Sequence, residues 1–249
     1  MNDPLRPGPV EPAPVLTVVI PFLNEAESIA PLLAELRDTL NALQVAAEVI
    51  AVNDGSTDAT GPALDAVART WPALHVMHFP QNRGQAAALW HGFRQARGTW
   101  LAMLDGDGQN PPAEFARLWP LRDTADMIAG ARTGRQDSKL RLTMSRVANA
   151  VRRGALCDGV SDTGCSLKLF RREVAASFLP IRTMYSFLPA FAVAAGYTVR
   201  EVAVGHRPRR AGISKYGLGV MAVFPLLDLV SLCWLLRRTV RQKTTPTRR

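Results

Sequence analysis

Two carboxylates and a side-chain amide alternate with glycines in a short stretch near the middle of the chain. Asp105, Asp107 and Gln109 follow the apolar run 100–104, which predicts a short buried strand opening into a loop. Their oxygens are the hard ligands that suit Mg²⁺ or Mn²⁺, ions that commonly bind through a few carboxylates and substrate phosphates. The stretch therefore predicts a metal–diphosphate site, although the same residues are also ordinary turn formers.

Apolar runs of strand length alternate with helical patterns through the first half of the chain. Strands are expected at residues 16–20, 48–52, 74–78 and 100–104, and helices at 29–43, after residue 58 and at 85–96. Such alternation is typical of a parallel sheet with helices on both faces. Open α/β sheets bind ligands outside the carboxyl ends of their strands, which is where the acidic stretch falls. The predicted fold is a three-layer α/β/α domain with a mainly parallel central sheet.

The second half of the chain is less regular. Further strands are expected at 126–130, 165–170 and 198–204, and a basic amphipathic helix at 139–156. Residues 217–236 are almost wholly apolar and long enough to cross a bilayer. Pro225 and Asp228 interrupt this run, and a central charge costs roughly 2.5–3.5 kcal/mol on insertion scales. We therefore expect a helix that lies in the membrane interface or packs on the rest of the protein.

The composition describes a globular protein with a strong positive charge. Hydrophobic residues make up 47% and charged residues 20% of the 249 residues, and the formal net charge is +9. This charge predicts an acidic partner: a phosphorylated substrate, an anionic membrane or a nucleic acid. Nucleic-acid binding is disfavoured because the basic residues are not interleaved with stacking aromatics. Cys157, Cys165 and Cys233 show no metal-ligand spacing and are expected to be free thiols in a reducing compartment.

Several short motifs occur along the chain in a fixed order. Four of them follow the first four predicted strands, at residues 21–25 (PFLNE), 53–58 (NDGSTD), 82–84 (NRG) and 105–107 (DGD). The others lie at residues 130–132 (GAR), 145–146 (SR), 164–172 (GCSLKLFRR) and 209–216 (RRAGISKY). The first set resembles family 2 glycosyltransferases with the GT-A fold, and the second resembles their dolichol-phosphate mannosyltransferase branch. The resemblance covers roughly residues 15–238.

The resemblance implies an inverting enzyme that moves a sugar from a nucleotide sugar to a polyprenyl phosphate. A bound Mg²⁺ or Mn²⁺ would neutralise the diphosphate leaving group as a Lewis acid. By resemblance Asp105, Asp107 and Gln109 hold this ion, Asp107 is a catalytic residue, and the backbone of Gly106 lies beside the nucleotide. The nucleoside would lie over the ends of the first two predicted strands, against Pro21, Leu23, Glu25, Val52 and Asp54.

Two positions depart from the mannosyltransferase pattern. Leu23 stands where an aromatic residue is common, and Asn53 stands where the first of two acids is common. Both positions lie where the base is read, so the sequence leaves GDP-sugars and UDP-sugars open as donors. The residues from Asn53 to Asp58 are also suited to a turn and a helix N-cap, which does not exclude a binding role.

The implied acceptor explains a second set of candidates. A polyprenyl phosphate is already anionic, so its attack needs no general base, but cations must hold two negative groups together. Arginine suits bidentate phosphate recognition, and lysine acts as a point charge. By resemblance Arg132, Arg209 and Lys215 bind the phosphates of donor or acceptor, with Ser145 or Arg146 nearby.

Asp162 leaves a second reaction open. It falls where many inverting enzymes of this fold place an acceptor-side acid, where it would orient a phosphate acceptor. With a sugar or lipid hydroxyl as acceptor, the same carboxylate would act as the general base. A catalytically inactive scaffold is disfavoured because both acids of the metal–diphosphate motif are present.

The chain is expected to divide into four parts. They are a proline-rich disordered leader at 1–14, a GT-A domain at 15–216, an apolar membrane-associating helix at 217–238 and a basic tail at 239–249. The leader has no apolar core and so is neither a signal peptide nor a span. The basic tail predicts attraction to anionic lipid. We expect a peripheral or minimally anchored protein at the cytoplasmic face of a membrane. The sequence carries no signal for the sugar or the oligomeric state.

Overall fold

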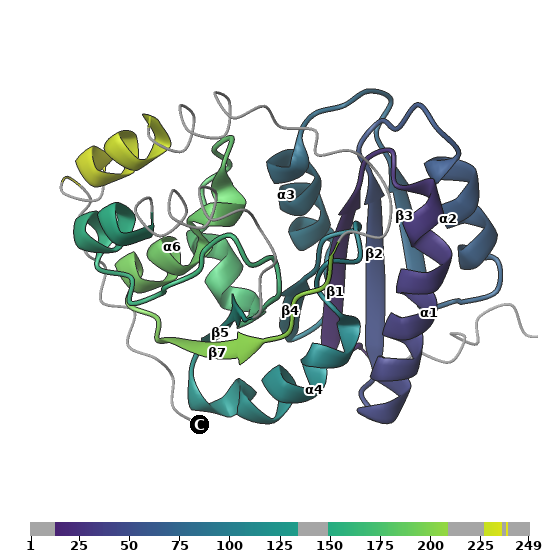
Figure 1. Cartoon of the computed structure of the whole chain (residues 1–249), viewed down its shortest axis with the longest axis horizontal. Coiled ribbons are helices and arrows are strands. Elements are labelled where there is room, and N and C mark those ends of the chain that lie inside the picture. The colour runs from purple at the N-terminus through teal and green to yellow at the C-terminus, as the bar shows by residue number, and fades with distance from the viewer. Residues whose placement is uncertain (1–12, 134–148, 209–226, 236–237, 239–249) are drawn as a thin grey trace, which may run out of the picture.

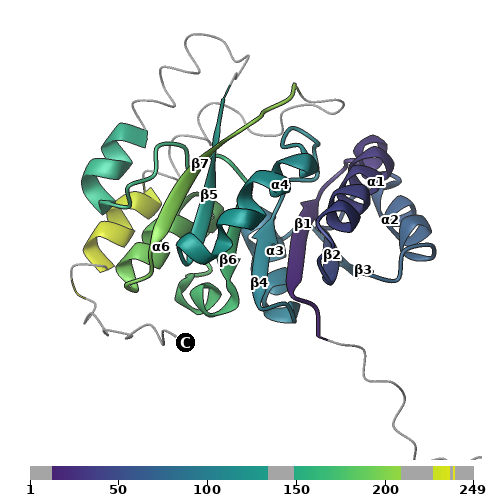
Figure 2. The same cartoon turned by 90° about the horizontal axis from the view of Figure 1, so that it is seen from below.

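A single seven-stranded sheet forms the centre of the computed structural model, which describes residues 13–133, 149–208, 227–235 and 238 (Figure 1). The strands are β1 (Leu16–Phe22), β2 (Ala47–Asn53), β3 (Leu74–His78), β4 (Trp100–Met103), β5 (Met127–Arg132), β6 (Lys168–Arg171) and β7 (Val199–Val204). Their order is β3-β2-β1-β4-β6-β5-β7, which Figure 2 shows from β3 at the right to β7 at the left.

Helices connect and cover these strands. The α-helices are α1 (Ala26–Ala42), α2 (Thr60–Ala68), α3 (Gln85–Gln95), α4 (Phe115–Leu118) and α6 (Leu188–Ala194), with further helical residues at 149–156 and 227–235. The 3₁₀-helices are η1 (Pro112–Glu114), η2 (Trp119–Thr124), η3 (Arg172–Ser177) and η4 (Met184–Ser186). Helices α1 and α2 lie on one side of β1, β2 and β3, and α3 lies on the other (Figure 1).

The predicted alternation of strands and helices in the first half is confirmed. β1 shows the reason, because it is buried on both faces: Val18 and Ile20 join the core cluster beneath α1, and Val19 joins the cluster beneath α3. A strand covered on both faces needs a continuous apolar run, which is the pattern that these segments carry. The predicted mainly parallel sheet is also confirmed. β6 runs antiparallel to both of its neighbours, β4 and β5.

The strand expected at 165–170 begins three residues later, at Lys168. The preceding residues form a turn that is hydrogen-bonded to the acidic loop. The basic helix expected at 139–156 is confirmed for residues 149–156, and its first part lies outside the described residues. Residues 1–12, which make up most of the predicted leader, and the tail at 239–249 also lie outside them.

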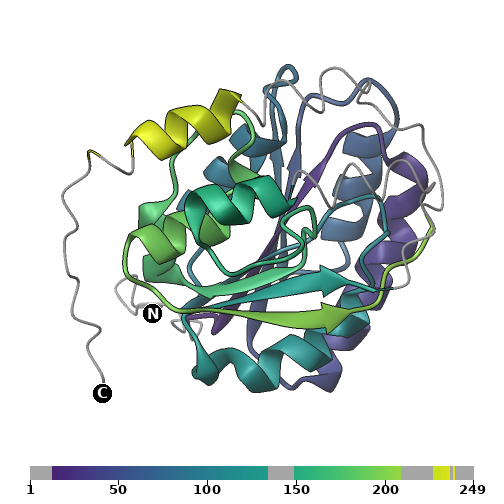
Figure 3. The same cartoon turned by 60° about the vertical axis from the view of Figure 1, so that its left-hand side comes forward.

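The described part of the apolar C-terminal run is a short helix that packs on the domain. It is the yellow helix on the side of the molecule away from α1 (Figures 1 and 3). Leu229 and Leu232 are buried in the core cluster shared with α3 and α6. Asp228 Oδ2 accepts hydrogen bonds from the backbone N–H of Thr183, at 3.1 Å, and from its hydroxyl, at 2.5 Å. Asp228, the charged residue within the apolar run, therefore binds this helix to the rest of the domain.

In the ranges that the structure describes, no helix combines the length and the apolar character needed to cross a bilayer. Within the segment 217–238, where a helix is predicted, residues 227–235 are helical, whereas residues 217–226 and 236–237 lie outside the described part. The outer face of this helix exposes large apolar side chains, namely Leu227, Val230, Trp234 and Leu235.

We predict that Asp228→Ala loosens the helix at 227–235. The substitution removes the acceptor of two donors on Thr183, which is only 5% exposed, and leaving such donors unsatisfied costs about 1–3 kcal/mol. Urea unfolding should show this loss, and limited proteolysis should cut the C-terminal segment sooner. Ser231→Ala, on the exposed face of the same helix, is the control. Equal stability of the two variants would contradict the docking role.

Candidate active site

The acidic loop lies at the carboxyl ends of β1, β2 and β4, where the sheet pattern predicts it. Gly106 packs it onto β1, because a Cβ at this position would lie 2.5 Å from Phe22 Cδ1 and 2.9 Å from the carbonyl oxygen of Pro21. The carbonyl of Gly106 accepts a hydrogen bond from Ser28 Oγ of α1, at 2.5 Å. A residue with a side chain would push this loop away from the strand and the helix that hold it.

Asp105 and Asp107 are two carboxylates of like charge on one short loop. Asp105 Oδ1 accepts a hydrogen bond from Gln85 Nε2 at 2.7 Å, and Asp107 Oδ1 accepts one from the backbone N–H of Gln109 at 3.0 Å. Burial and the charge of Asp107 raise the pKa of Asp105 to about 6. The two carboxylates therefore repel each other in a partly desolvated position, and a cation between them would relieve that repulsion.

This donor set fits a hard divalent ion that also binds phosphate. Asp105, Asp107 and Gln109 share one loop and offer carboxylate and amide oxygens. Among the described residues, no group of three or more His, Cys, Asp and Glu side chains is placed to hold a metal ion. An ion bound here would thus take two carboxylates from the protein and depend on further oxygens, as Mg²⁺ and Mn²⁺ do at diphosphate sites.

The loops after β1 and β2, which carry the predicted nucleoside contacts, are bonded into one unit. The backbone N–H of Asn24 donates to Ser56 Oγ at 3.0 Å, and that of Thr57 donates to Asn24 Oδ1 at 2.8 Å. The backbone N–H of Glu25 donates to Thr60 Oγ1 at 2.9 Å. The predicted contact residues Pro21, Leu23, Glu25, Val52 and Asp54 are brought to the same end of the sheet on these two strands and loops.

Asp54 also holds the loop before α3. It is almost fully buried, and its carboxylate accepts hydrogen bonds from the backbone N–H groups of Arg83 at 2.7 Å and Gly84 at 2.9 Å. Burial raises the pKa of this carboxyl against the lowering effect of the two hydrogen bonds. The motif at 82–84 thus meets Asp54 through its backbone, a link that its residue types do not reveal.

Asn53 is explained by a hydrogen-bonded chain that sequence reasoning missed. Its Oδ1 accepts from the backbone N–H of Ser56, and its Nδ2 lies 3.0 Å from His78 Nδ1. His78 Nε2 lies 3.0 Å from Asp65 Oδ1, so the consistent tautomer carries its proton on Nε2 and accepts at Nδ1. An ionised acid at position 53 would have no donor for that nitrogen. The amide at position 53, which departs from the family pattern, is therefore suited to hydrogen bonding with His78.

The structure pairs Arg132 with Asp162, two candidates that the sequence treats separately. Arg132 Nε and Nη2 each donate to one carboxylate oxygen at 2.8 Å, and the backbone N–H of Arg132 donates at 3.1 Å. The side chains are only 15% and 12% exposed. Burial alone would lower the pKa of the Arg132 guanidinium, but its hydrogen bonds and charge pairing with Asp162 raise it overall. Both oxygens of Asp162 are thus engaged by a permanent cation.

Lys168 and Ser166 are site residues that the sequence pattern did not single out. Lys168 Nζ is buried and donates to the carbonyls of Thr163, at 3.3 Å, and Cys165. Burial lowers the pKa of this ammonium, against the raising effect of nearby negative groups that include Asp105. Ser166 Oγ accepts from the backbone N–H of Asp105, at 3.1 Å. The turn before β6 is therefore hydrogen-bonded beneath the acidic loop. The motif at 164–172 contains both residues, but it gave no role to either of them.

Four predicted phosphate-side residues lie outside the described residues: Ser145, Arg146, Arg209 and Lys215. The segment just before Arg209 is described, and its Arg207 donates a backbone hydrogen bond to the carbonyl oxygen of Gln109 at 2.8 Å. The three cysteines are free thiols, as predicted, and burial raises the pKa of Cys165 to about 11.

We predict that Asp105→Asn stabilises the metal-free protein. The folded-state pKa of about 6 lies above 3.8, the ordinary value for an aspartate, so the ionised carboxylate opposes folding above pH 6. Removing the charge should add about 1–2 kcal/mol at pH 7.5, after allowance for partial exposure. As the pH falls from 6 towards 4, the wild type takes up its proton on folding and the difference should shrink.

Thermal unfolding in EDTA across this pH range measures the effect. Asp123→Asn, which removes an exposed carboxylate on η2, is the control. A less stable Asp105→Asn variant at pH 7.5 would contradict the proposed charge repulsion.

The chain is similar in sequence to known sugar-transferring proteins. A family model described as glycosyl transferase family 2 matches residues 17–179. Undecaprenyl-phosphate 4-deoxy-4-formamido-L-arabinose transferase of Yersinia pestis (strain Pestoides F) is 35% identical over 211 residues, which are 84% of this chain and 64% of the relative. The protein of the same name from Yersinia pseudotuberculosis (serotype O:3, strain YPIII) gives the same values. The chain thus spans about 64% of the length of these relatives.

Solved structures share the fold. Glucosyl-3-phosphoglycerate synthase from Mycobacterium tuberculosis, in complex with Mn²⁺, UDP and glucosyl-3-phosphoglycerate, has a TM-score of 0.65 and 21% identity and covers 89% of this chain and 80% of its own. A mannosyltransferase from Pyrobaculum calidifontis, in complex with GDP-Man and Mn²⁺, has a TM-score of 0.65 and 20% identity, covering 93% of this chain and 67% of its own. The predicted GT-A fold is therefore confirmed.

Proposed function

The chain belongs to glycosyl transferase family 2, and from this premise we propose that it moves a sugar from a GDP-sugar or UDP-sugar to a polyprenyl phosphate. The observation that carries the proposal is the charge arrangement at the carboxyl ends of the strands. Two close carboxylates on one loop suit a metal-bound diphosphate, and a half-buried arginine, Arg132, lies at the end of β5, two strands away from β4 in the sheet. We assign residues 15–216 to the catalytic domain, with a leader before it and the apolar helix and basic tail after it.

The donor would lie across the ends of β1, β2 and β4. Asp105, Asp107 and Gln109 would hold the divalent ion, which when bound supplies Lewis-acid stabilisation of the diphosphate leaving group. Pro21, Leu23, Glu25, Val52 and Asp54 would contact the nucleoside, and Gly106 would let the nucleotide approach the backbone. The Mn²⁺ complexes of two proteins with this fold support a divalent metal, and their UDP and GDP-Man ligands leave both bases open.

The acceptor side favours a phosphate over a hydroxyl. In the proposed transfer, a phosphate oxygen forms the bond to the anomeric carbon as the bond to the diphosphate breaks, with inversion, so no proton has to be removed. Asp162 fits this reaction because both of its oxygens are bonded to Arg132 and it is poorly placed to abstract a proton. The pair uses Nε and Nη2 of Arg132, so Nη1 is the nitrogen that we propose for phosphate, together with Arg209 and Lys215.

The identity of the acceptor is supported by sequence relatives. The names of the Yersinia proteins specify undecaprenyl phosphate, and their 35% identity extends over most of this chain. We therefore propose a long-chain polyprenyl phosphate of this kind. The sugar is left to experiment, because the neighbours with known ligands share only the fold.

A lipid acceptor requires the protein to reach a membrane surface. The exposed apolar face of the helix at 227–235 would enter the interface, where tryptophan is favoured. Arg238 stacks over Trp234 at 4.9 Å from the ring centre, and further basic residues follow at 241, 243, 248 and 249. We propose a peripheral position on the cytoplasmic face, held by this apolar face and by attraction of the basic tail to anionic lipid.

The test incubates the purified protein with undecaprenyl phosphate and a panel of GDP-sugars and UDP-sugars, in Mn²⁺ or in EDTA. A metal-dependent glycosyl phospholipid is the expected product, and it would identify the donor. Nucleotide release without a lipid product would move the acceptor to a hydroxyl and return Asp162 to the role of base, which a loss of rate at low pH, as the carboxylate takes up a proton, would reveal. Failure to bind any nucleotide sugar would overturn the proposal.

We predict that Asp107→Ala lowers transfer at least about 100-fold because it removes a carboxylate ligand of the metal–diphosphate. Incorporation of labelled sugar into lipid measures the loss, and circular dichroism checks the fold. Asp123→Ala, in an exposed turn outside the loop, should retain transfer. Retention of most activity by Asp107→Ala would contradict the metal assignment.

A further inference from the structure

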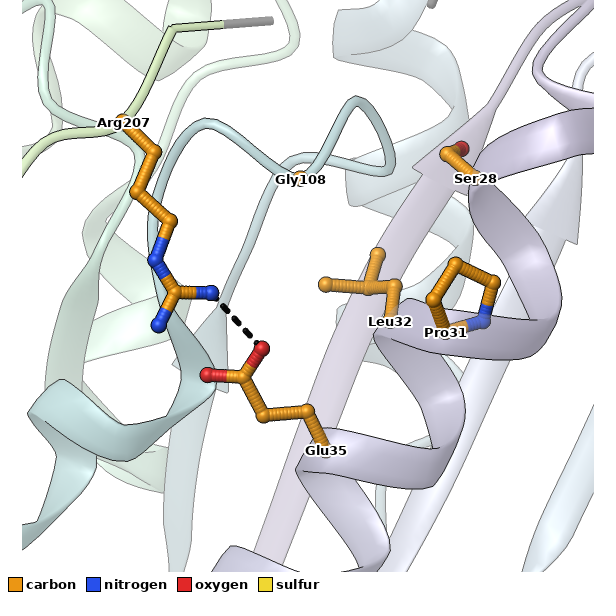
Figure 4. A pocket seen from close by; sticks show the side chains of 6 residues that line it. All are labelled: Ser28, Pro31, Leu32, Glu35, Gly108 and Arg207. Atoms are coloured by element: carbon orange, nitrogen blue, oxygen red, sulfur yellow. Dashed lines mark hydrogen bonds and ion pairs between the residues drawn. The ribbon is translucent and has the colours of Figure 1, made fainter. Parts of the chain in front are cut away.

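Arg207 links three parts of the site that are distant in the sequence. It lies in the segment that follows β7, and its Nη1 lies 2.8 Å from Glu35 Oε2 on α1 (Figure 4). Its backbone N–H donates to the carbonyl oxygen of Gln109, also at 2.8 Å. One residue thus joins the outer helix, the end of the acidic loop and the segment that leads to Arg209.

Glu35 and Ser28 hold the same loop from one face of α1. They are seven residues apart, or about two helical turns, so their side chains leave α1 on the same side. Ser28 bonds directly to Gly106 at the start of the loop, and Glu35 reaches its end through Arg207 and Gln109. The space between them, bordered by Leu32 and Gly108, is a cavity of about 10 Å³ (Figure 4). A space this small is not a ligand pocket, so the residues around it form a packing contact between α1 and the loop.

The loop needs such a restraint at this end. Gly108, between Asp107 and Gln109, has a φ of +73°, and a Cβ there would meet no atom of the described residues within 4 Å. Glycine is conformationally free, so Gly108 itself restrains the loop little. Two backbone hydrogen bonds hold Gln109: its N–H donates to Asp107 Oδ1 at 3.0 Å, within the loop, and its carbonyl accepts from Arg207 at 2.8 Å. Of these two, only the bond from Arg207 ties Gln109 to a distant part of the chain.

We propose that Glu35 and Arg207 are positioning residues that act as a clamp on the metal loop. The clamp sets the place of Gln109 relative to Asp105 and Asp107 and thereby the affinity for the ion. Ion pairs with partly exposed side chains, here 39% and 25%, contribute little to global stability, so the effect should be local. This inference rests on the metal site of the proposed function, although it concerns residues to which that function assigns no role.

The test titrates Mn²⁺ alone into metal-free protein, followed by electron paramagnetic resonance. Glu35→Gln and Arg207→Gln should each weaken Mn²⁺ binding about tenfold, the lower end of the effect seen for residues that orient metal ligands. Arg207→Lys, which keeps the charge, should lose less. The exchanged pair Glu35→Arg with Arg207→Glu should return affinity to within about threefold of the wild type.

Hydrogen exchange gives a second readout that needs no metal. In the metal-free protein, Glu35→Gln should speed exchange of the Arg207 amide, because that amide is bonded to Gln109. The matched control is Arg171→Gln, which removes an ion pair to Asp126 with similar exposure, 37% and 22%, beside the amino end of β4 and thus at the end of the sheet opposite the acidic loop. It should change neither the Mn²⁺ affinity nor the exchange of the Arg207 amide.

The outcomes separate the clamp from the function on which it rests. If the wild type does not bind Mn²⁺, the proposed metal site fails, whereas the exchange data still report on the contact. If the wild type binds Mn²⁺ and Glu35→Gln changes neither affinity nor exchange, the clamp is overturned. Equal losses in Glu35→Gln and Arg171→Gln would also overturn it, because they would show a general loss of stability.

Discussion

The repulsion between Asp105 and Asp107 is the constraint around which the rest of the site is arranged. Two carboxylates on one short loop, partly removed from water, are unfavourable without a counterion, as the raised pKa of Asp105 shows. The surrounding groups hold the loop in place despite this cost: Gly106 lies on β1, Ser28 and Ser166 bond to its backbone, and Gln85 donates to Asp105. In the proposed function a bound cation would relieve this repulsion.

Positive charge is distributed around this loop at different depths. Lys168 is enclosed under it and bonded to two carbonyls, so it supports the turn and stabilises the nearby acids without reaching a ligand. Arg132 is nearer the surface and is held by Asp162, which orients the guanidinium and keeps it charged. An arginine restrained in this way can meet phosphate at a small entropic cost, and its partner carboxylate needs no chemical role of its own.

In the C-terminal helix, a charged residue within an apolar segment binds that segment to the domain. Its inner residues, Leu229 and Leu232, join the core of the domain, and Asp228 bonds to Thr183. Its outer residues remain exposed and apolar, so one short helix can link the domain to a lipid surface without entering the bilayer core. In the proposed reaction this would keep the soluble donor site at a constant distance from the headgroups of the acceptor.

The pattern of apolar residues was enough to locate the strands and helices of the first half, because a strand buried on both faces requires a continuous apolar run and a covering helix requires a periodic one. It also placed Asp105, Asp107 and Gln109 on one loop at the end of a strand. The folded chain was needed to show that β6 runs antiparallel, that Arg132 pairs with Asp162, that Asp54 holds the loop at 82–84 and that Lys168 lies beneath the acids. It likewise revealed η1, α4 and η2, whose short turns carry no helical period. The spacing of apolar residues shows which faces of a single segment are buried. The contacts named above join residues up to tens of positions apart in the sequence, so they depend on the order of the strands in the sheet.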